Sequence, residues 1–251
     1  KKFNKVLSVV VASAMVMAMA GCGNTDNGSA ATGTNAATES AAADNGAASG
    51  SVFKIGGIGP TTGGAAVYGL AVQHGAEVAV KEINEAGGIN GAQIEFQFQD
   101  DEHDAEKSVN AYNTLKDWGM QALVGTTTSA PCIAVADKTA ADNMFQITPS
   151  GSAVECAANP NVFRVCYSDP AQGTASAKYI GEHKLASKIA VIYDSSDVYS
   201  SGIYEKFAQE APNQGLEVVD AEAFTADSNK DFSTQLQKAK ESGAELVFLP
   251  I

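Results

Sequence analysis

From residue 52 onward, short apolar runs alternate with longer stretches in which apolar residues recur every three or four positions. Short runs bounded by Gly, Pro or Asn are typical of buried strands, and the longer periodic stretches are typical of amphipathic helices. We expect strands at residues 52–58, 93–99, 120–124, 144–148, 162–167, 188–193, 216–221 and 245–249. We expect helices at residues 65–86, 104–118, 130–141, 169–184, 202–211 and 231–241.

This order of elements predicts an α/β protein, because strands that alternate with helices of about a dozen residues form βαβ units around a parallel sheet. The pattern divides near Cys166–Asp169. We therefore expect two doubly wound parallel-sheet lobes with a cleft between them. Residues 52–168 would form the first part of lobe 1, and residues 169–251 would form lobe 2.

The first 51 residues have a different character. Three lysines precede an apolar run at residues 6–19, which is short for a membrane span and typical of a secretory signal. The run ends in Gly21-Cys22, which resembles a bacterial lipobox, so we expect residues 1–21 to be a signal peptide and Cys22 to be lipidated. A plain signal peptide with a chance cysteine is the alternative. Residues 22–51 are rich in Gly, Ala, Ser, Thr and Asn, and we expect a flexible tether.

Charge and composition exclude several classes of partner. Apolar residues make up 45% of the chain and the formal net charge is −13, which is typical of a globular protein without a basic surface to follow phosphates. We therefore expect no nucleic-acid partner, and no docking on anionic lipid by charge. Contact with the membrane would come through the lipid anchor.

Polar residues follow two of the expected strands. Residues 123–129 read Leu-Val-Gly-Thr-Thr-Thr-Ser, and residues 145–152 read Phe-Gln-Ile-Thr-Pro-Ser-Gly-Ser. Pro149 ends the second strand, and Gly151 allows close approach to the backbone. Ligands bind at the carboxyl edge of open α/β sheets. Hydroxyls and free amides at two such ends predict a pocket for a small zwitterion.

We expect neither catalysis nor a cofactor at this pocket. No Gly-x-Ser-x-Gly elbow occurs, and His74, His103 and His183 lack the spacing of metal ligands. His103 lies in an acidic run that reads as a solvated turn and helix cap. The glycines at residues 56–59 do not have dinucleotide-loop spacing.

Motifs along the whole region resemble those of the leucine/isoleucine/valine-binding proteins, the type I solute-binding subunits of ABC importers. The matching pieces include Ile58-Gly59-Pro60, Gly87-Gly88-Ile89-Asn90-Gly91, Ile147-Thr148-Pro149, Gln172-Gly173 and Lys230-Asp231-Phe232-Ser233. The resemblance covers the chain from Val52 and implies the type I periplasmic-binding-protein fold. The family continues beyond the position where this sequence ends, so we expect a C-terminally truncated chain.

The resemblance also implies ligand contacts. Ser129 would hold the ligand carboxylate through its hydroxyl and amide, helped by the amide of Ser152. The carbonyl of Ser150 and the hydroxyl of Ser152 would take the ammonium group. Tyr68 and Tyr199 would cover the ligand side chain from the two lobes.

One position departs from the family pattern. An acidic residue is expected before the Lys-Asp-Phe-Ser motif to pair with the ammonium group, and Asn229 stands there. Asn229 could accept a hydrogen bond without balancing charge. Either a nearby carboxylate supplies the charge, or the ligand is not a simple α-amino acid. The candidate carboxylates are Asp227, Asp194, Asp197 and Asp169.

The resemblance predicts an extracytoplasmic lipoprotein that binds a small amino acid, with branched-chain amino acids favoured, and delivers it to the transmembrane subunits of an ABC permease. We expect a monomer on the outer face of the cytoplasmic membrane, and the long tether favours a Gram-positive cell surface. Two alternatives remain: a binder of an amide, urea or aromatic acid, and a ligand-sensing receptor for a membrane kinase.

The three cysteines beyond Cys22 are Cys132, Cys156 and Cys166. Cys156 and Cys166 could pair across the intervening turn, or all three could be free, buried thiols.

Overall fold

The computed structural model describes Gly50 and residues 52–251. These residues fall within one compact unit, residues 45–251. The signal peptide, the lipidated Cys22 and the tether expected from the sequence lie outside the described residues, apart from Gly50. Within the described part, no helix has the length and apolar character needed to cross a membrane.

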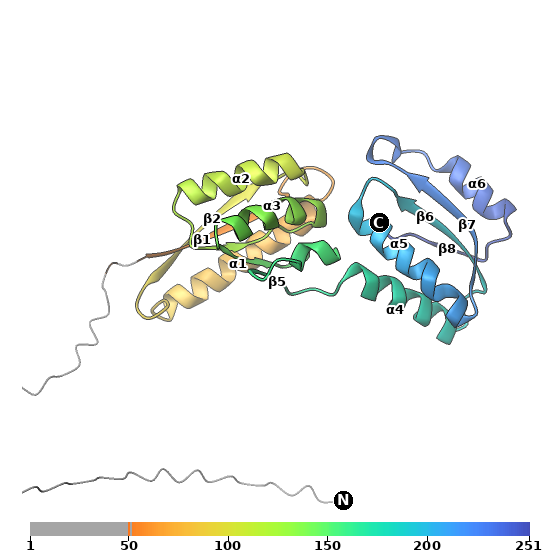
Figure 1. The fold of residues 1–251 in the computed structure, drawn as a ribbon, viewed down its shortest axis with the longest axis horizontal. Helices are drawn as coiled ribbons and strands as arrows, with labels where there is room; N and C mark the ends of the chain where they lie inside the picture. Colours follow the sequence, from red (N-terminus) through yellow and green to blue (C-terminus); the bar gives the residue numbers. More distant parts are fainter. Residues whose placement is uncertain (1–49, 51) are drawn as a thin grey trace, which may run out of the picture. The chain divides into compact units, whose positions relative to one another are not determined.

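The first sheet contains five parallel strands in the order β2-β1-β3-β4-β5. Helix α1 covers one face, and α2 and α3 pack side by side on the other (Figure 1). In chain order the elements are β1 (Val52–Gly59), α1 (Ala66–Glu85), β2 (Gln93–Asp100), α2 (Ala105–Asp117), β3 (Ala122–Val124), α3 (Ser129–Ala141), β4 (Phe145–Thr148), the 3-10 helix η1 (Val154–Ala157) and β5 (Val162–Arg164).

The second sheet contains three parallel strands in the order β7-β6-β8. Helices α4 and α5 pack against each other, and α6 contacts β7 (Figure 1). The elements are α4 (Asp169–Glu182), β6 (Lys188–Asp194), α5 (Val198–Glu210), η2 (Ala211–Gln214), β7 (Glu217–Phe224), η3 (Ala226–Ser228), α6 (Ser233–Glu241) and β8 (Leu246–Phe248).

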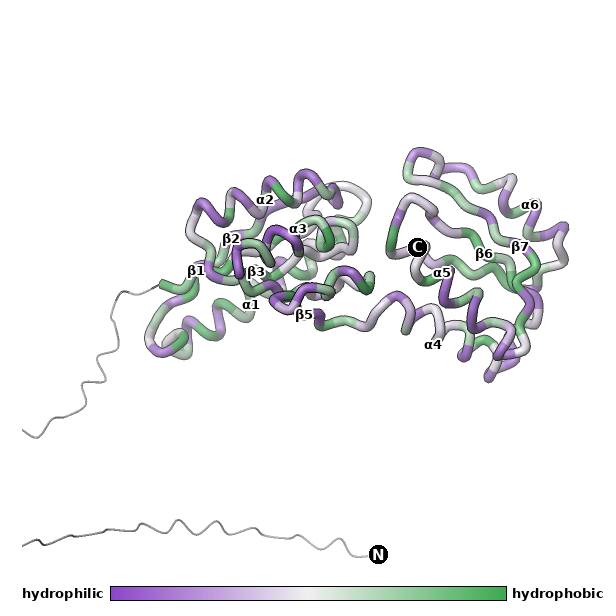
Figure 2. The backbone as a smooth tube through the Cα atoms, in the orientation of Figure 1, coloured by the Kyte–Doolittle hydropathy of each residue, from purple (hydrophilic) through white to green (hydrophobic). Residues whose placement is uncertain are grey.

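Each sheet has its own apolar core. Leu115 on α2 and Leu123 on β3 are fully buried in the first, and Ile189, Val191 and Phe207 are fully buried between β6 and α5 in the second. Figure 2 shows the apolar stretch of β6 in green. β6 is nearly continuous in apolar residues because both of its faces are covered, as in other parallel sheets.

The α/β class and the parallel sheets expected from the sequence are confirmed, and each expected strand and helix occurs. The predicted start of α5 was wrong by one turn: we expected the helix to begin at residue 202, and it begins at Val198. The side chain of Asp197 caps this helix by accepting a hydrogen bond from the backbone amide of Tyr199 at 3.1 Å. β5 is shorter than expected and ends at Arg164.

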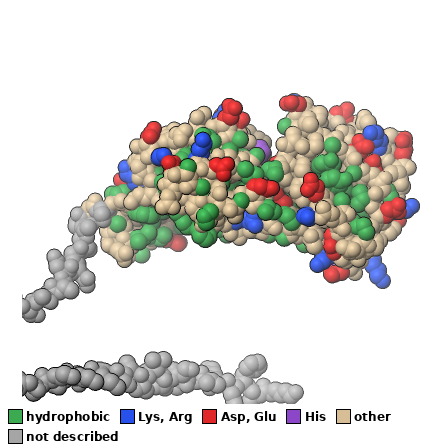
Figure 3. All heavy atoms as spheres, viewed as in Figure 1, with side chains coloured by type: hydrophobic (Ala, Val, Ile, Leu, Met, Phe, Trp, Pro, Cys, Tyr) green, Lys and Arg blue, Asp and Glu red, His purple; other side chains and the backbone are tan. Residues whose placement is uncertain are grey.

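Some large apolar side chains remain exposed. They include Val67 on α1, Val165 after β5, and Tyr179 on α4. Figure 3 shows hydrophobic side chains between scattered charged ones on one face.

Gly173 allows α4 and α5 to pack closely. A Cβ atom there would meet the Ile203 carbonyl oxygen and would lie 2.8 Å from the Phe207 amide nitrogen, both on α5. We expect Gly173→Ala to lower the free energy of unfolding by about 1–3 kcal/mol, because the extra methyl overpacks the contact. Gly75→Ala is the matched control, since nothing lies within 4 Å of a Cβ on this exposed helical glycine. Gly75→Ala should raise stability by about 0.5–1 kcal/mol. Urea denaturation checks both, and equal effects would contradict the packing argument.

Candidate functional site

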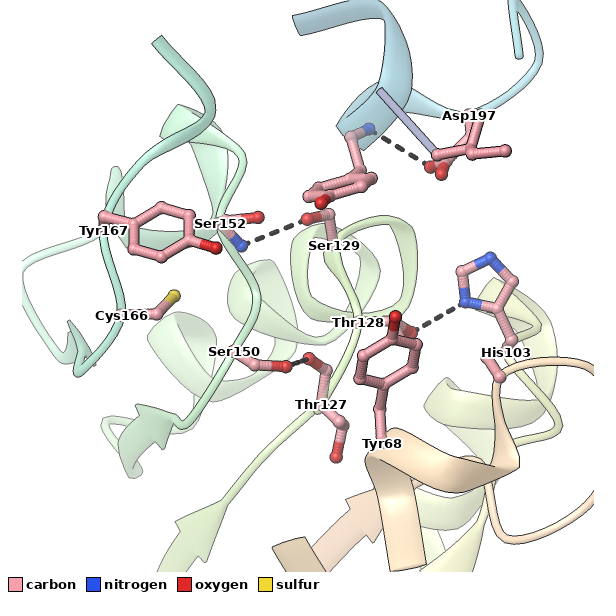
Figure 4. A pocket seen from close by; sticks show the side chains of 13 residues that line it. Tyr68, His103, Thr127, Thr128, Ser129, Ser150, Ser152, Cys166, Tyr167 and Asp197 are labelled. Atoms are coloured by element: carbon pink, nitrogen blue, oxygen red, sulfur yellow. Dashed lines mark hydrogen bonds between the residues drawn. The ribbon is translucent and has the colours of Figure 1, made fainter. Parts of the chain in front are cut away.

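A cavity of about 270 Å³ lies at the carboxyl edge of the first sheet (Figure 4). Residues from the loops that follow several strands line it, together with the start of α5 and Ile251. Parallel strands bring these loops to the same edge, where ligands bind in open α/β sheets. The lining residues are Ala65, Tyr68, His103, Thr127, Thr128, Ser129, Ser150, Ser152, Cys166, Tyr167, Asp197, Tyr199 and Ile251.

Ser129 lies at the first position of α3 and is 4% exposed. Its Oγ accepts a hydrogen bond from the backbone amide of Ser152 at 3.1 Å (Figure 4) and another from the backbone amide of Ala153 at 3.2 Å. A serine hydroxyl has two acceptor lone pairs and one proton to donate. Because two amides already use the lone pairs, the Ser129 hydroxyl can offer a ligand only its proton. The group is therefore oriented to bind an anionic acceptor.

The N-terminus of α3 adds further donors beside this hydroxyl. The amides of Ser129 and Ala130 are in the first helical turn, where no intrahelical carbonyl can accept from them. Pro131 follows and carries no amide proton. The helix dipole also favours a negative charge at this end. A carboxylate fits this set of donors.

Ser150 and Ser152 lie on the loop after β4 and differ in exposure. Ser150 is exposed, and its hydroxyl donates to the Thr127 carbonyl oxygen at 2.6 Å. Ser152 is 3% exposed. The sequence predicted that the Ser152 amide would contact the carboxylate, but in the structure this amide donates to Ser129 Oγ. Its contribution is to orient the Ser129 hydroxyl.

Aromatic side chains form the walls of the cavity. Tyr68, near the start of α1, is 59% exposed, and Tyr199 on α5 is half-buried. Burial raises the pKa of Tyr199. Tyr167, on the loop after β5, also lines the cavity and was not among the residues that the sequence indicated. The structure thus brings Tyr68 and Tyr199 to one cavity with the three serines.

Asn229 lies elsewhere. It is exposed at the end of η3 and is not among the residues that line the cavity. Of the carboxylates considered from the sequence, Asp227 is exposed in η3, and Asp194 accepts hydrogen bonds from Ser196. Asp197 lines the cavity. The structure therefore brings Asp197, and not Asn229, to the serines.

Asp169 is buried directly behind Ser152. Its side chain is 1% exposed, and its backbone amide donates to the Ser152 carbonyl oxygen at 3.0 Å. Within the described part of the chain, neither carboxylate oxygen has a hydrogen-bond partner of good geometry. Burial, reinforced by the nearby charges of Asp197 and Glu155, raises the pKa of Asp169 to about 6, although Ser152 and Arg164 oppose the shift. An unpaired, buried carboxyl group therefore belongs to a residue that contacts Ser152, which lines the cavity.

His103 has a role that the sequence did not indicate. The acidic run is a mostly exposed turn in which Asp104 caps α2, as expected. In addition, the exposed His103 lines the cavity, and its Nδ1 lies 2.8 Å from Thr128 Oγ1. The feature that places His103 at the cavity is the pairing of β1 with β2. Gly59 and Asp100 are register partners, so the loops that follow these two residues lie at the same edge of the sheet. This edge can be inferred from a parallel sheet only after the order of the strands is known.

All three described cysteines are free thiols. Cys132 and Cys156 are fully buried, and Cys166 is half-buried in the cavity lining. The pairing of Cys156 with Cys166 that the sequence left open is absent, because the Cys156 thiol points to the Ser129 carbonyl oxygen at 3.6 Å. Among residues 52–251, no cluster of three or more His, Cys, Asp or Glu side chains could hold a metal ion.

Comparisons with known proteins agree on one family. Residues 52–250 match the family described as periplasmic binding protein. The Leu/Ile/Val-binding protein homolog 3 of Brucella melitensis is 34% identical over 196 residues, which cover 77% of this chain and 53% of that protein. The leucine-, isoleucine-, valine-, threonine- and alanine-binding protein of Pseudomonas aeruginosa is 32% identical over 198 residues, with 78% and 52% covered.

A solved structure is similar over the same region. It is the branched-chain amino acid transporter substrate-binding protein LivJ from Streptococcus pneumoniae in complex with isoleucine, with a TM-score of 0.73 and 29% identity. The match covers 79% of this chain and 56% of that one. The chain therefore spans about half the length of the relatives it matches.

Proposed function

Because this chain belongs to the periplasmic binding protein family, type I, as its sequence motifs indicated, we propose that it binds a small amino acid in the cavity described above. The amino acid would then be delivered to the transmembrane subunits of an ABC permease. The relatives are binding proteins by name, and the proposal includes no chemical step. Binding would be followed by release to the permease.

The observation that carries the proposal is the direction of the hydrogen bonds at Ser129. Two buried amides fill the lone pairs of its Oγ, which leaves a hydroxyl proton beside the free amides of α3. Charge-assisted hydrogen bonds of this kind are about twice as strong as neutral ones. They support a carboxylate as the group that this corner of the cavity holds.

The charges around the cavity support an amine on the same ligand. The charged side chain in the lining is Asp197, and Asp169 lies behind Ser152. Arg164 does not line the cavity. Its Nη1 donates instead to the Ser152 and Ala153 carbonyl oxygens at 3.3 and 3.0 Å. We propose that Asp169 and Asp197 supply the negative charge that Asn229 lacks. A ligand with both an acid and an amine satisfies both sides of the site.

The tyrosine walls favour an apolar side chain on that amino acid. Aromatic rings supply apolar contact while each hydroxyl stays hydrated or bonded, as when Tyr199 accepts from Gln172 Nε2 at 3.4 Å. We propose branched-chain amino acids as the ligand class. An aromatic acid, an amide or urea remains the alternative, and Asp197 disfavours the first of these because it would repel a ligand that is only an anion.

We propose that the protein acts outside the cytoplasm. The family implies an extracytoplasmic location. We propose that the protein is a monomer anchored through lipidated Cys22. We also propose that it delivers its ligand to a permease and does not signal to a membrane kinase. The curated relatives named above come from Gram-negative bacteria and do not support the Gram-positive surface that the sequence favoured.

Calorimetry with the full chain and a matched set of ligands tests the proposal. Leucine, isoleucine and valine should bind. 3-Methylbutylamine lacks the carboxylate of leucine and 4-methylpentanoate lacks its amine, and each should bind about 10- to 150-fold more weakly than leucine, as expected for lost hydrogen bonds to a charged group. Binding of 4-methylpentanoate or 4-hydroxybenzoate as tight as that of leucine would contradict the roles of Asp169 and Asp197. A heat signal that does not saturate as ligand is added, or steady formation of a product from the ligand, would contradict the binding function itself.

A further inference from the structure

Two buried cysteines lie next to each other beneath the ligand-binding serines. Cys132 is on α3 and Cys156 is on η1, and both are fully buried in one apolar cluster with Ala153. The binding function proposed above uses neither thiol. The segment that carries Cys156 also carries the Ala153 amide that donates to Ser129 Oγ.

Several contacts place the two side chains around the same small space. A Cβ atom on Gly151 would lie 3.1 Å from Cys132 Cβ and 3.2 Å from Cys156 Sγ. Cys132 Sγ lies 4.0 Å from the Cys156 carbonyl oxygen. The closeness of the two thiols is the largest influence on both groups; it lowers the pKa of Cys132 and raises that of Cys156. The thiolate form attacks a disulfide, so Cys132 is the thiol placed to react first.

Cys166 differs from this pair. It is half-buried, it lines the ligand cavity on the loop after β5, and it is not part of the apolar cluster. Burial is the largest influence on its thiol and raises its pKa. The geometry therefore favours a pair of Cys132 with Cys156 and leaves Cys166 as the odd thiol.

We propose that Cys132 and Cys156 form an intramolecular disulfide when the protein matures outside the cytoplasm, a location that rests on the family assignment. The oxidant would be another disulfide, either of a thiol–disulfide oxidoreductase or of glutathione. The Cys132 thiolate attacks that disulfide and forms a mixed disulfide, which releases one thiol. The Cys156 thiol then loses its proton and attacks Cys132 Sγ, which releases the second thiol. The protein loses two hydrogens and two electrons, and the oxidant gains them.

The bond would tie η1 to α3 directly below the site. Both thiols are fully buried, so the oxidant reaches them when η1 opens locally; η1 is a short 3-10 helix on which Val154 and Glu155 are exposed. Once closed, the bond holds the segment from Ser152 to Cys156 against the helix whose first residue is Ser129. It would stabilise the arrangement in which two amides orient the Ser129 hydroxyl.

The test uses the full chain treated with oxidised glutathione and then alkylated in denaturant without reductant. Peptide mapping should find the peptide that contains Cys132 joined to the peptide that contains Cys156, and reductant should release two further alkylatable thiols. The oxidised protein should melt about 5–10 °C above the reduced one, as expected for a bond that closes a loop of this size.

Two variants serve as controls. Cys166→Ser should keep both the crosslink and the reductant-sensitive shift in melting temperature, whereas Cys156→Ala should lose both. If Cys156→Ala fails to fold, the peptide map of the wild-type protein decides. A wild-type map with free Cys132 and Cys156 after oxidation, or with Cys156 joined to Cys166, would overturn the proposal.

Discussion

Ser129→Ala is expected to weaken amino-acid binding by about 10- to 150-fold and to lower the free energy of unfolding by about 2–4 kcal/mol. The first effect follows because the variant removes a hydrogen bond to a charged ligand group, which contributes about 1.5–3 kcal/mol. The second follows because the amides of Ser152 and Ala153 lose their acceptor in a buried place, at a cost of about 1–3 kcal/mol for each unsatisfied group. Calorimetry with leucine and urea denaturation measure the two effects separately.

Thr139→Val is the matched control for loss of stability alone. Thr139 is fully buried near the other end of α3, where its hydroxyl donates to Gln146 Oε1 at 2.7 Å and accepts from Asn161 Nδ2 at 3.0 Å. Removing that hydroxyl should lower stability by about 1–3 kcal/mol and leave affinity unchanged. If Thr139→Val weakens binding as much as Ser129→Ala does, the loss reflects general destabilisation, and Ser129 has no direct role.

Asp169→Asn is expected to act in opposite directions on stability and on binding. At pH 7 the variant should be more stable than the wild type by about 2–3 kcal/mol, because the wild type must keep an ionised carboxylate whose pKa burial has raised from 3.8 to about 6. The same variant should bind leucine about 10- to 150-fold more weakly, because Asp169, which does not line the cavity, would attract the ammonium group through space and that negative charge is gone. A residue with a purely structural role would not combine a gain in stability with a loss of affinity.

The pH dependence gives a second readout of this carboxyl group. A raised folded-state pKa means that the folded protein holds a proton which the unfolded chain has released. Stability from this group is therefore greatest below about pH 4 and falls as the pH rises to about 6. Asp101 acts in the same direction, because its full burial raises its pKa to about 6. Asp169→Asn should reduce the slope of stability between pH 4 and 6 without abolishing it.

Asp117→Asn controls for a simple change in net charge. Asp117 ends α2 and is exposed, so its replacement should leave the stability at pH 7 and the affinity for leucine within error of the wild type. An Asp169→Asn variant that binds leucine normally would remove Asp169 from the proposed site and leave Asp197 as the remaining candidate from the lining.

The agreement between sequence and structure is strongest where the information is local. Apolar runs and periodic stretches were enough to predict β1 to β8 and the helices between them, because each element depends mainly on neighbours within a few residues. The start of α5 was misplaced for a local reason too: Asp197 could be recognised as a cap only together with the amide of Tyr199. Ser129, Ser150 and Ser152 could be proposed because both loops follow strands whose ends share an edge.

Other features depended on residues that are distant in the sequence. The role of the Ser152 amide, the position of His103 beside Thr128, and the place of Tyr167 in the cavity each join segments more than ten residues apart. Whether Cys156 lies next to Cys166 or next to Cys132 also depends on contacts between segments that are distant in the sequence. Spacing along the chain does not give these distances.

The order of apolar and polar residues was therefore sufficient to predict the α/β class and the loops that carry the serines, and the resemblance of the sequence motifs indicated the family. Only the folded chain could show that Ser129 Oγ accepts from two amides and offers its proton. Only the folded chain could show that Asp197 lines the same cavity and that Asp169 contacts Ser152, whereas Asn229 is not in the lining. The reason is physical. Secondary structure follows from short-range preferences, whereas the direction of a hydrogen bond and the pKa of a buried carboxyl group depend on every atom that the fold brings within a few ångströms.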